Sequence, residues 1–260
     1  MKRQIAILAT AMLLFASGCT KEGGTETSFA QTAASTDMDN AGTRPSAGIS
    51  DENRTDGSRI LIAYFTRLDN TEAELEEILQ GGGPYGSLDS SLEDSDLDAV
   101  ASASIQLIGD EVQGSTEAVA RMIQTQTGGD LFSIRTVQSY PVNYDDLIDQ
   151  GGEERNQKYR PELSSHVENM EEYEVVFLGF PDWWYDMPMA VYSFLEEYDF
   201  SGKTVIPFVT SASSGFSGSI ERMRELIPGA KVMEPGLEVR MTEVAQAQEA
   251  VAGWLEKLGY

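Results

Sequence analysis

Residues 175–180 read VVFLGF, a run that contains no polar side chain. A continuous apolar run of this length is typical of a strand buried on both faces in the middle of a parallel sheet. Similar short runs recur along the chain, and together they predict a five-stranded sheet. The other strands are expected at 60–65, 130–134 and 204–209, with 231–233 and 237–239 sharing the fifth position.

Segments with helical periodicity separate these runs. Val119, Met122 and Ile123 follow the i, i+3, i+4 spacing that places apolar side chains on one helical face. The polar stretch 143–170 is expected to be only partly helical, with a break at Gly151-Gly152. Strands that alternate with helices predict an α/β domain of three layers, doubly wound, with helices on both faces of a parallel sheet. The apolar helices are expected at 115–127, 187–197, 218–226 and 242–258.

Charge and composition exclude several classes of protein. The 260 residues carry 43 Asp and Glu against 18 Lys and Arg, a formal net charge of −25. Nucleic acids and anionic membrane surfaces would repel such a chain, whereas basic partner proteins would not. One cysteine excludes a disulfide framework, and one histidine excludes multi-histidine metal sites.

The first 58 residues predict export and a tether. Lys2 and Arg3 precede twelve largely apolar residues, 5–16, too few to cross a bilayer, which needs roughly 20. Small residues then lead to Cys19, so we expect a lipoprotein signal peptide over 1–18 and a lipid on the Cys19 thiol. Residues 19–58, poor in large apolar side chains, are expected to be a disordered tether. The protein is then a lipoprotein facing the periplasm or cell exterior, and an ordinary signal peptide with an incidental cysteine is the alternative.

Three loops follow the carboxyl ends of predicted strands, where ligands of open α/β sheets bind. Thr66 and Arg67 end the first strand, and Gly114-Ser115-Thr116 opens a helix whose free amides favour an anion. Residues 68–112 between them are interpreted as an acidic insertion in one phosphate-binding loop within the folded domain 59–260. The alternative is that Ser115 only caps the helix.

The other two loops are aromatic and hydroxyl-rich. Two adjacent tryptophans, Trp183 and Trp184, follow the central strand, and they indicate a wall for a planar ring. The residues of the loop 210–218 are mostly small, and many are serines, which suits the polar edge of a flat ligand. A flexible connector of the same composition is the alternative. Together the three loops predict a site for a phosphorylated planar heterocycle.

The motifs YFT at 64–66, GST at 114–116, GFPDWW at 179–184 and SGKTVIPFVTS at 201–211 resemble those of bacterial flavodoxins. The resemblance implies FMN held without a covalent bond, on a sheet with the strand order 2-1-3-4-5. It implies a phosphate site, a stacking wall and a pyrimidine edge. The candidate residues are Thr66, Arg67, Gly114, Ser115 and Thr116 for the phosphate; Pro181, Asp182, Trp183, Trp184 and Tyr185 for the wall; and Thr210, Ser211, Ala212, Ser213, Ser214 and Gly215 for the edge.

Three functions are compatible with this sequence. The first is an FMN-dependent electron carrier whose redox partners have basic docking surfaces, since this chain is strongly acidic. In such a carrier, the carboxylates of Asp182 and Asp186 would lower the reduction potential of FMN. The second is an FMN-dependent NAD(P)H:quinone-type reductase. The third is a flavodoxin-like binding module that has lost FMN, because the insertion splits the phosphate loop.

Overall fold

The computed structural model describes residues 59–71, 105–108, 111–141 and 144–260. The expected signal peptide, Cys19 and the tether lie outside the described residues, as does most of the insertion, 72–104. None of the helices within the described ranges has the length and apolarity needed to cross a membrane.

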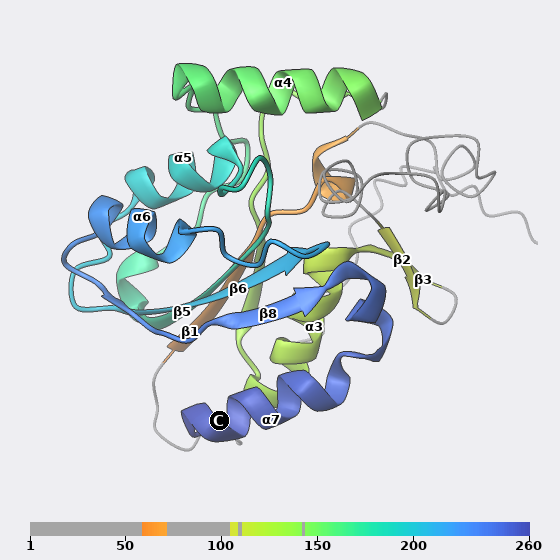
Figure 1. Ribbon diagram of the computed structural model, residues 1–260. Helices are drawn as coiled ribbons and strands as arrows, with labels where there is room; N and C mark the ends of the chain where they lie inside the picture. The colour runs from red at the N-terminus through yellow and green to blue at the C-terminus, as the bar shows by residue number, and fades with distance from the viewer. Residues whose placement is uncertain (1–58, 72–104, 109–110, 142–143) are drawn as a thin grey trace, which may run out of the picture. The chain divides into compact units, whose positions relative to one another are not determined.

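A parallel sheet forms the middle layer (Figure 1). Its strand order is β4-β1-β5-β6-β7, and β8 also pairs with β6. When the strands of this sheet alone are numbered along the chain, with β7 and β8 counted as one position, the order is 2-1-3-4-5. This confirms the predicted fold class. The two last strands pair with successive halves of β6, through Val205↔Val232 and Phe208↔Leu237. The bounds are β1 Arg59–Tyr64, β4 Asp130–Ser133, β5 Tyr173–Pro181, β6 Thr204–Ser211, β7 Lys231–Val232 and β8 Leu237–Arg240.

The apolar run at 175–180 lies in β5, between β1 and β6. Phe177 and Leu178 are fully buried on opposite faces, because successive side chains of a strand alternate. Gly179 is required here, since a Cβ at this position would lie 2.1 Å from the ring of Phe208 on β6. The continuous apolar pattern therefore reflects burial on both sides of the sheet.

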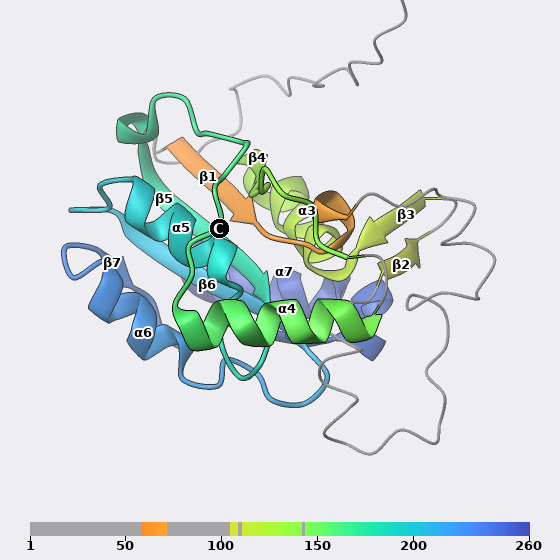
Figure 2. The ribbon, with the colours of Figure 1, turned by 90° about the horizontal axis from the view of Figure 1, so that it is seen from above.

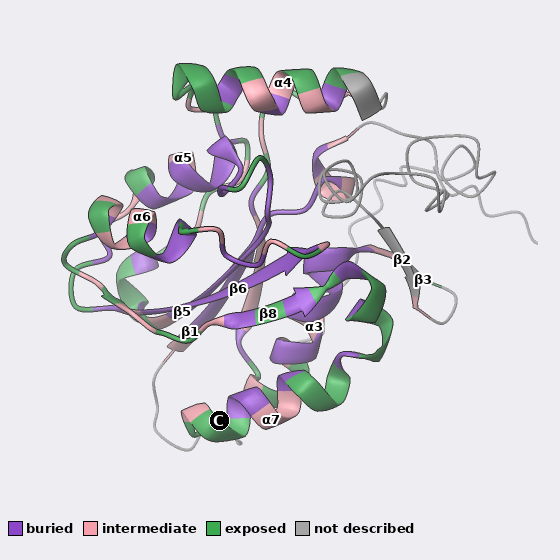
Figure 3. Ribbon diagram, in the orientation of Figure 1, coloured by how far each residue is buried: buried purple, intermediate pink, exposed green. Residues whose placement is uncertain are grey.

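Two helical layers cover the sheet, and each has its own apolar core (Figure 3). Figure 1 shows α4, α5 and α6 on one face and α3 and α7 on the other. The bounds are α3 Ser115–Thr127, α4 Tyr144–Gln157, α5 Met189–Glu197, α6 Ser219–Leu226 and α7 Gln248–Leu258. Short 3-10 turns are η2 Leu68–Asn70, η3 Met170–Glu172 and η4 Met241–Gln246.

An antiparallel hairpin of β2, Ile105–Ile108, and β3, Glu111–Gly114, leads directly into α3 (Figure 2). The principal helix after the first strand thus starts at Ser115, as expected, and the described end of the insertion is β-structured.

Two helix predictions need correction. The expected break at Gly151-Gly152 is wrong, because α4 runs through both glycines to Gln157. A glycine costs a helix only about 1 kcal/mol, and a Cβ at Gly152 would lie 3.3 Å from the indole of Trp184. The glycines therefore leave room for that side chain. The last helix starts at Gln248 rather than 242, because 241–246 forms the tighter η4.

Candidate functional site

The two halves of the predicted phosphate loop meet in space. Thr66 follows β1, Gly114 lies just after the insertion, and a Cβ on Gly114 would lie only 1.8 Å from Thr66 Oγ1. The chain therefore returns, after the insertion, to the point it left. Thr66, Ser115 and Thr116 are all buried there, at the start of α3. The side chain of Arg67, also buried, donates to the Pro141 carbonyl at 3.1 Å. The insertion has not separated the residues that the sequence assigned to one loop.

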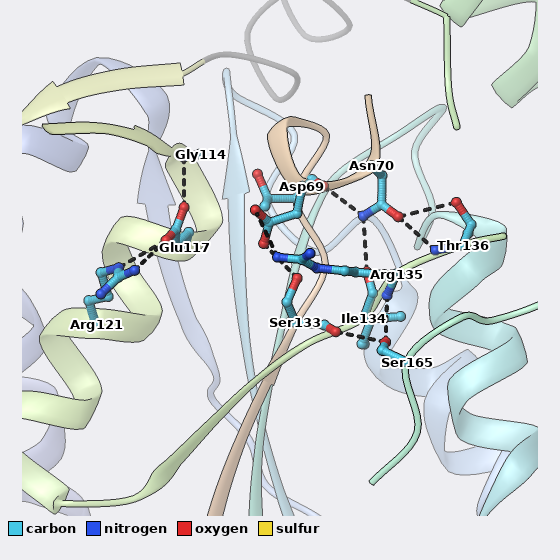
Figure 4. Close-up of polar contacts among 11 residues, drawn as sticks. Asp69, Asn70, Gly114, Glu117, Arg121, Ser133, Ile134, Arg135, Thr136 and Ser165 are labelled. Atoms are coloured by element: carbon cyan, nitrogen blue, oxygen red, sulfur yellow. Dashed lines mark hydrogen bonds and ion pairs between the residues drawn. The ribbon is translucent and has the colours of Figure 1, made fainter. Parts of the chain in front are cut away.

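Glu117 modifies the electrostatics at the start of α3. The Gly114 N–H donates to Glu117 Oε2 at 3.3 Å, and Arg121 forms an ion pair with Glu117 Oε1 at 2.8 Å (Figure 4). The Arg121 guanidinium thus balances this carboxylate. Acidic residues in the first turn stabilise a helix, so Glu117 serves α3 itself. Glu117 was not among the site residues predicted from the sequence.

A second network fixes the chain just after Thr66 and Arg67. The Asn70 side chain donates to the carbonyls of Thr66 at 2.9 Å and Ile134 at 3.0 Å, and it accepts the Thr136 N–H at 2.8 Å (Figure 4). Ser133 donates to Asp69 Oδ2 at 2.6 Å. Asn70 is buried, so these bonds tie the end of β1 to the end of β4. Asp69 and Asn70 fell within the predicted insertion and were not among the residues predicted for the site.

The aromatic loop is a tight two-residue turn. Trp183 and Asp186 exchange both backbone hydrogen bonds, at 2.9 and 3.0 Å. Trp184 and Tyr185 between them have φ values of +55° and +58°. This is the type I′ geometry, which normally takes glycine or asparagine at both central positions. Holding a residue with a Cβ there costs roughly 1–2 kcal/mol. Two bulky aromatic side chains are thus held in a strained turn.

The turn directs its aromatic side chains differently. Trp183 is 8% exposed and packs edge-on against Phe65 and Tyr140, with ring centroids 5.3 and 5.4 Å away. Trp183 therefore belongs to the core, which narrows the expected stacking wall to Trp184 and Tyr185. These two side chains are 43% and 54% exposed.

Trp184 is also held in place. Its indole Nε1 donates to the Ile148 carbonyl of α4 at 3.1 Å, and its ring lies over Gly151 and Gly152. This contact joins the turn to α4. It depends on two glycines inside a helix, and no pattern in the sequence predicted it.

The third loop is joined to both of the others. Thr210 Oγ1 lies 2.8 Å from Thr116 Oγ1, in hydrogen-bond contact. Asp182 accepts a hydrogen bond from Ser214 Oγ at 2.5 Å, and its N–H donates to the Thr210 carbonyl at 3.0 Å. The Gly215 N–H donates to Ser211 Oγ at 3.0 Å, which folds the loop back on itself. Pro181, Thr210 and Ser211 are buried, Ala212 and Ser214 are half-buried, and Ser213 is exposed.

Asp186 has partners that the sequence did not reveal. Its carboxylate accepts the Tyr192 hydroxyl at 2.8 Å and lies 3.6 Å from Arg155 Nε and 3.3 Å from Arg222 Nη1. Burial, and then the bond to Asp186, raise the pKa of Tyr192 well above its usual range, so the hydroxyl remains a donor. The Asp186 charge is therefore compensated, and Asp182 is the stronger candidate for acting on a bound ring.

Across the described ranges, no group of histidine, cysteine, aspartate or glutamate side chains could hold a metal ion. The convergent loops offer hydroxyls, amides and aromatic faces, which suit an organic ligand with an anionic group.

Comparison with known proteins gives a consistent result. The family model described as flavodoxin matches residues 109–258. No curated protein sequence matches the chain significantly. Two candidate flavoproteins, from Bacteroides eggerthii and Bacteroides uniformis, are each 24% identical, with TM-scores of 0.53 and 0.52. They cover 78% and 77% of this chain and 99% of their own chains.

A third solved structure is a Lactobacillus acidophilus flavoprotein in complex with FMN. It is 14% identical, covers 73% of this chain and 97% of its own, and has a TM-score of 0.45. At 24% identity the two Bacteroides structures show a shared fold alone.

Proposed function

Because the chain belongs to the flavodoxin family, we propose that it binds FMN without a covalent bond and carries electrons outside the cytoplasm. The observation that carries the proposal is the convergence of three loops at the carboxyl edge of the sheet. Thr116 contacts Thr210, and Asp182 contacts Ser214, so the loops form one connected rim. Ligands of open parallel sheets bind at this edge.

The residues present fit each part of FMN. Thr66, Ser115 and Thr116 supply hydroxyls beside the first turn of α3, where amide groups and the helix dipole favour a phosphate. Trp184 and Tyr185 supply exposed aromatic faces for the ring. The loop 210–215 supplies small polar groups for the pyrimidine edge. FMN, when bound, supplies the electron-transfer chemistry, and the protein supplies binding, orientation and electrostatics.

The electrostatic contribution of this chain comes from Asp182. Its carboxylate is buried in the rim, where it accepts a hydrogen bond from Ser214. A fixed negative charge in a low-dielectric rim opposes the gain of further negative charge nearby. We therefore expect Asp182 to hold the reduction potential low.

A titration of the purified full chain with FMN, followed by quenching of flavin fluorescence, tests the proposal. We expect saturable 1:1 binding. Thr116→Val removes one hydroxyl at nearly constant shape and should weaken FMN affinity about tenfold. Thr125→Val is the matched control, since the Thr125 hydroxyl donates to the Arg121 carbonyl in the same helix, away from the three loops. No uptake of FMN, or equal affinity in both variants, would overturn the assignment.

We propose further that Cys19 carries a lipid anchor and that redox partners dock through basic surfaces. The net charge of −25 supports the choice of partner. Membrane fractionation of the Cys19→Ala variant tests the anchor: it should move from the membrane to the soluble fraction.

A steady-state assay with NAD(P)H tests the carrier role, since direct turnover without a partner enzyme would show a reductase instead.

A further inference from the structure

A cavity of about 530 Å³ opens beside the aromatic turn, on the side of the sheet covered by α4, α5 and α6. Its polar lining comes from separate segments of the chain: the end of α4, the residues that follow it, the aromatic turn, α5 and α6. The charged and hydroxyl groups concerned are Arg155, Lys158, Arg160, Asp186, Tyr192, Arg222 and Glu225. Its volume lies within the usual range for small-molecule sites, roughly 300–1,000 Å³.

The cavity is basic in a strongly acidic chain. Four of the 18 Lys and Arg line it, against two acids, Asp186 and Glu225, which gives a local charge of +4 − 2 = +2. Arg160 is also engaged by Glu196, at 2.8 and 2.7 Å, so a charge of +1 remains after this pair is counted. The whole chain, by contrast, carries −25. An anion that the rest of the surface repels would be attracted here.

Favourable interactions with the helix dipole do not account for all of these cations. Arg155 lies in the last turn of α4, where a positive charge favours the helix dipole. Arg222, however, is the fourth of the eight residues of α6, midway along the helix, where the dipole gives a cation no advantage. Arg222 is held there by the Ser217 carbonyl at 3.1 Å and by Asp186 at 3.3 Å.

The cavity has a built interior. Asp186 is 6% exposed and lies between the guanidinium groups of Arg155 and Arg222, which orients both toward one space. The Tyr192 hydroxyl donates to the same carboxylate, and Arg160 stacks 4.7 Å over the Tyr192 ring. Oriented guanidinium groups bind phosphate and carboxylate through paired hydrogen bonds.

We propose that this cavity binds a small organic dianion, one that carries a phosphate group or two carboxylates. Arg155, Lys158 and Arg222 supply the charge, while Asp186 keeps the two arginines in position. Because Asp186 closes the strained turn and the Arg222 guanidinium also reaches the Tyr185 carbonyl, at 3.5 Å, the occupant lies directly behind the aromatic wall. This site is separate from the hydroxyls at the start of α3 and does not depend on FMN.

Isothermal titration of the purified full chain at low ionic strength tests the proposal, with inorganic pyrophosphate and succinate as probes. We expect saturable binding of at least one probe, weakened by added salt, and the variants below separate the cavity from the phosphate loop at the start of α3. Pyrophosphate alone would indicate a phosphate ligand, and succinate alone a dicarboxylate. Saturable binding of neither probe would overturn the proposal.

Variants locate the site. Arg222→Gln and Lys158→Gln should each weaken binding about tenfold, the effect of one charge-assisted contact. Arg224→Gln is the control: it lies two residues further along α6, pairs with Glu234 at 2.7 Å and does not line the cavity. Circular dichroism checks that each variant is folded, and equal binding in all three would refute the assignment.

Anion binding at the cavity can be tested separately from FMN binding at the three loops. Thr116→Val should weaken FMN binding and leave the anion affinity unchanged, whereas Arg222→Gln should weaken anion binding. A protein that binds pyrophosphate but not FMN would retain this inference and lose the proposed function. Loss of pyrophosphate binding in Thr116→Val would instead place the anion at the phosphate loop and overturn the inference.

Discussion

Tyr185 offers a direct test of the strained turn, because its backbone has a φ of +58° while its side chain is 54% exposed. Replacing it with glycine or alanine removes the same exposed ring. The two variants then differ mainly in backbone: alanine keeps the left-handed strain, and glycine does not. Trp184 is less suitable, since its substitution also breaks the bond to α4.

The expected difference follows from two opposing terms. The left-handed conformation costs a residue with a Cβ roughly 1–2 kcal/mol. Glycine makes the unfolded chain more flexible than alanine does, and this lowers the free energy of unfolding by roughly 0.4–1 kcal/mol relative to alanine. Tyr185→Gly should therefore have a free energy of unfolding about 1 kcal/mol higher than Tyr185→Ala. For a domain of this size the difference corresponds to a melting temperature about 2–4 °C higher.

Urea unfolding followed by circular dichroism measures this difference. Ser213 is a suitable control, since it is exposed in the neighbouring loop and is not among the described residues with positive φ. There the order should reverse, with Ser213→Ala more stable than Ser213→Gly. If Tyr185→Ala proves as stable as Tyr185→Gly, the turn does not hold residue 185 in the left-handed region, and the account of the aromatic wall fails.

Three further predictions concern buried carboxylates. Asp186→Asn removes the shared partner of Arg155 and Arg222 and should lower the free energy of unfolding by about 1–3 kcal/mol, a value reduced by the partial exposure of both arginines; a change below 0.5 kcal/mol would contradict the ion-pair geometry. Asp182→Asn should raise the reduction potential of bound FMN on the order of tens of millivolts in a redox titration, and an unchanged potential would exclude Asp182 from tuning. Burial raises the pKa of Glu154 above 4.5, so the stability that its protonated form contributes is present below that pH and is lost as the pH rises through the folded-state pKa. The stability of Glu154→Gln relative to the parent should consequently increase with pH above 4.5 until it levels off, whereas a difference that stays constant across that range would show that Glu154 titrates normally.

The sequence by itself determined the architecture. The apolar run at 175–180 marks a strand buried on both faces, and the helical spacing at Val119, Met122 and Ile123 marks the helix that covers one of them. Both signals are local, because burial imposes its period on residues that are close in the chain. Thr66 and Gly114 could be assigned to one site for a related reason: Thr66 follows the carboxyl end of β1, where ligands of open parallel sheets bind, and Gly114 directly precedes the helix that leads from that edge to the next strand.

Only the tertiary structure decided how the site is built. Trp183 and Trp184 are adjacent and chemically alike, yet one lies in the core against Phe65 and the other rests on α4. That choice depends on the backbone of the turn and on the space left by Gly151 and Gly152, neither of which has a periodic signal. Long-range pairing is equally invisible along the chain, because contact energies depend on distance in space. Arg155 and Arg222 therefore meet at Asp186 only once the sheet and its helices have formed.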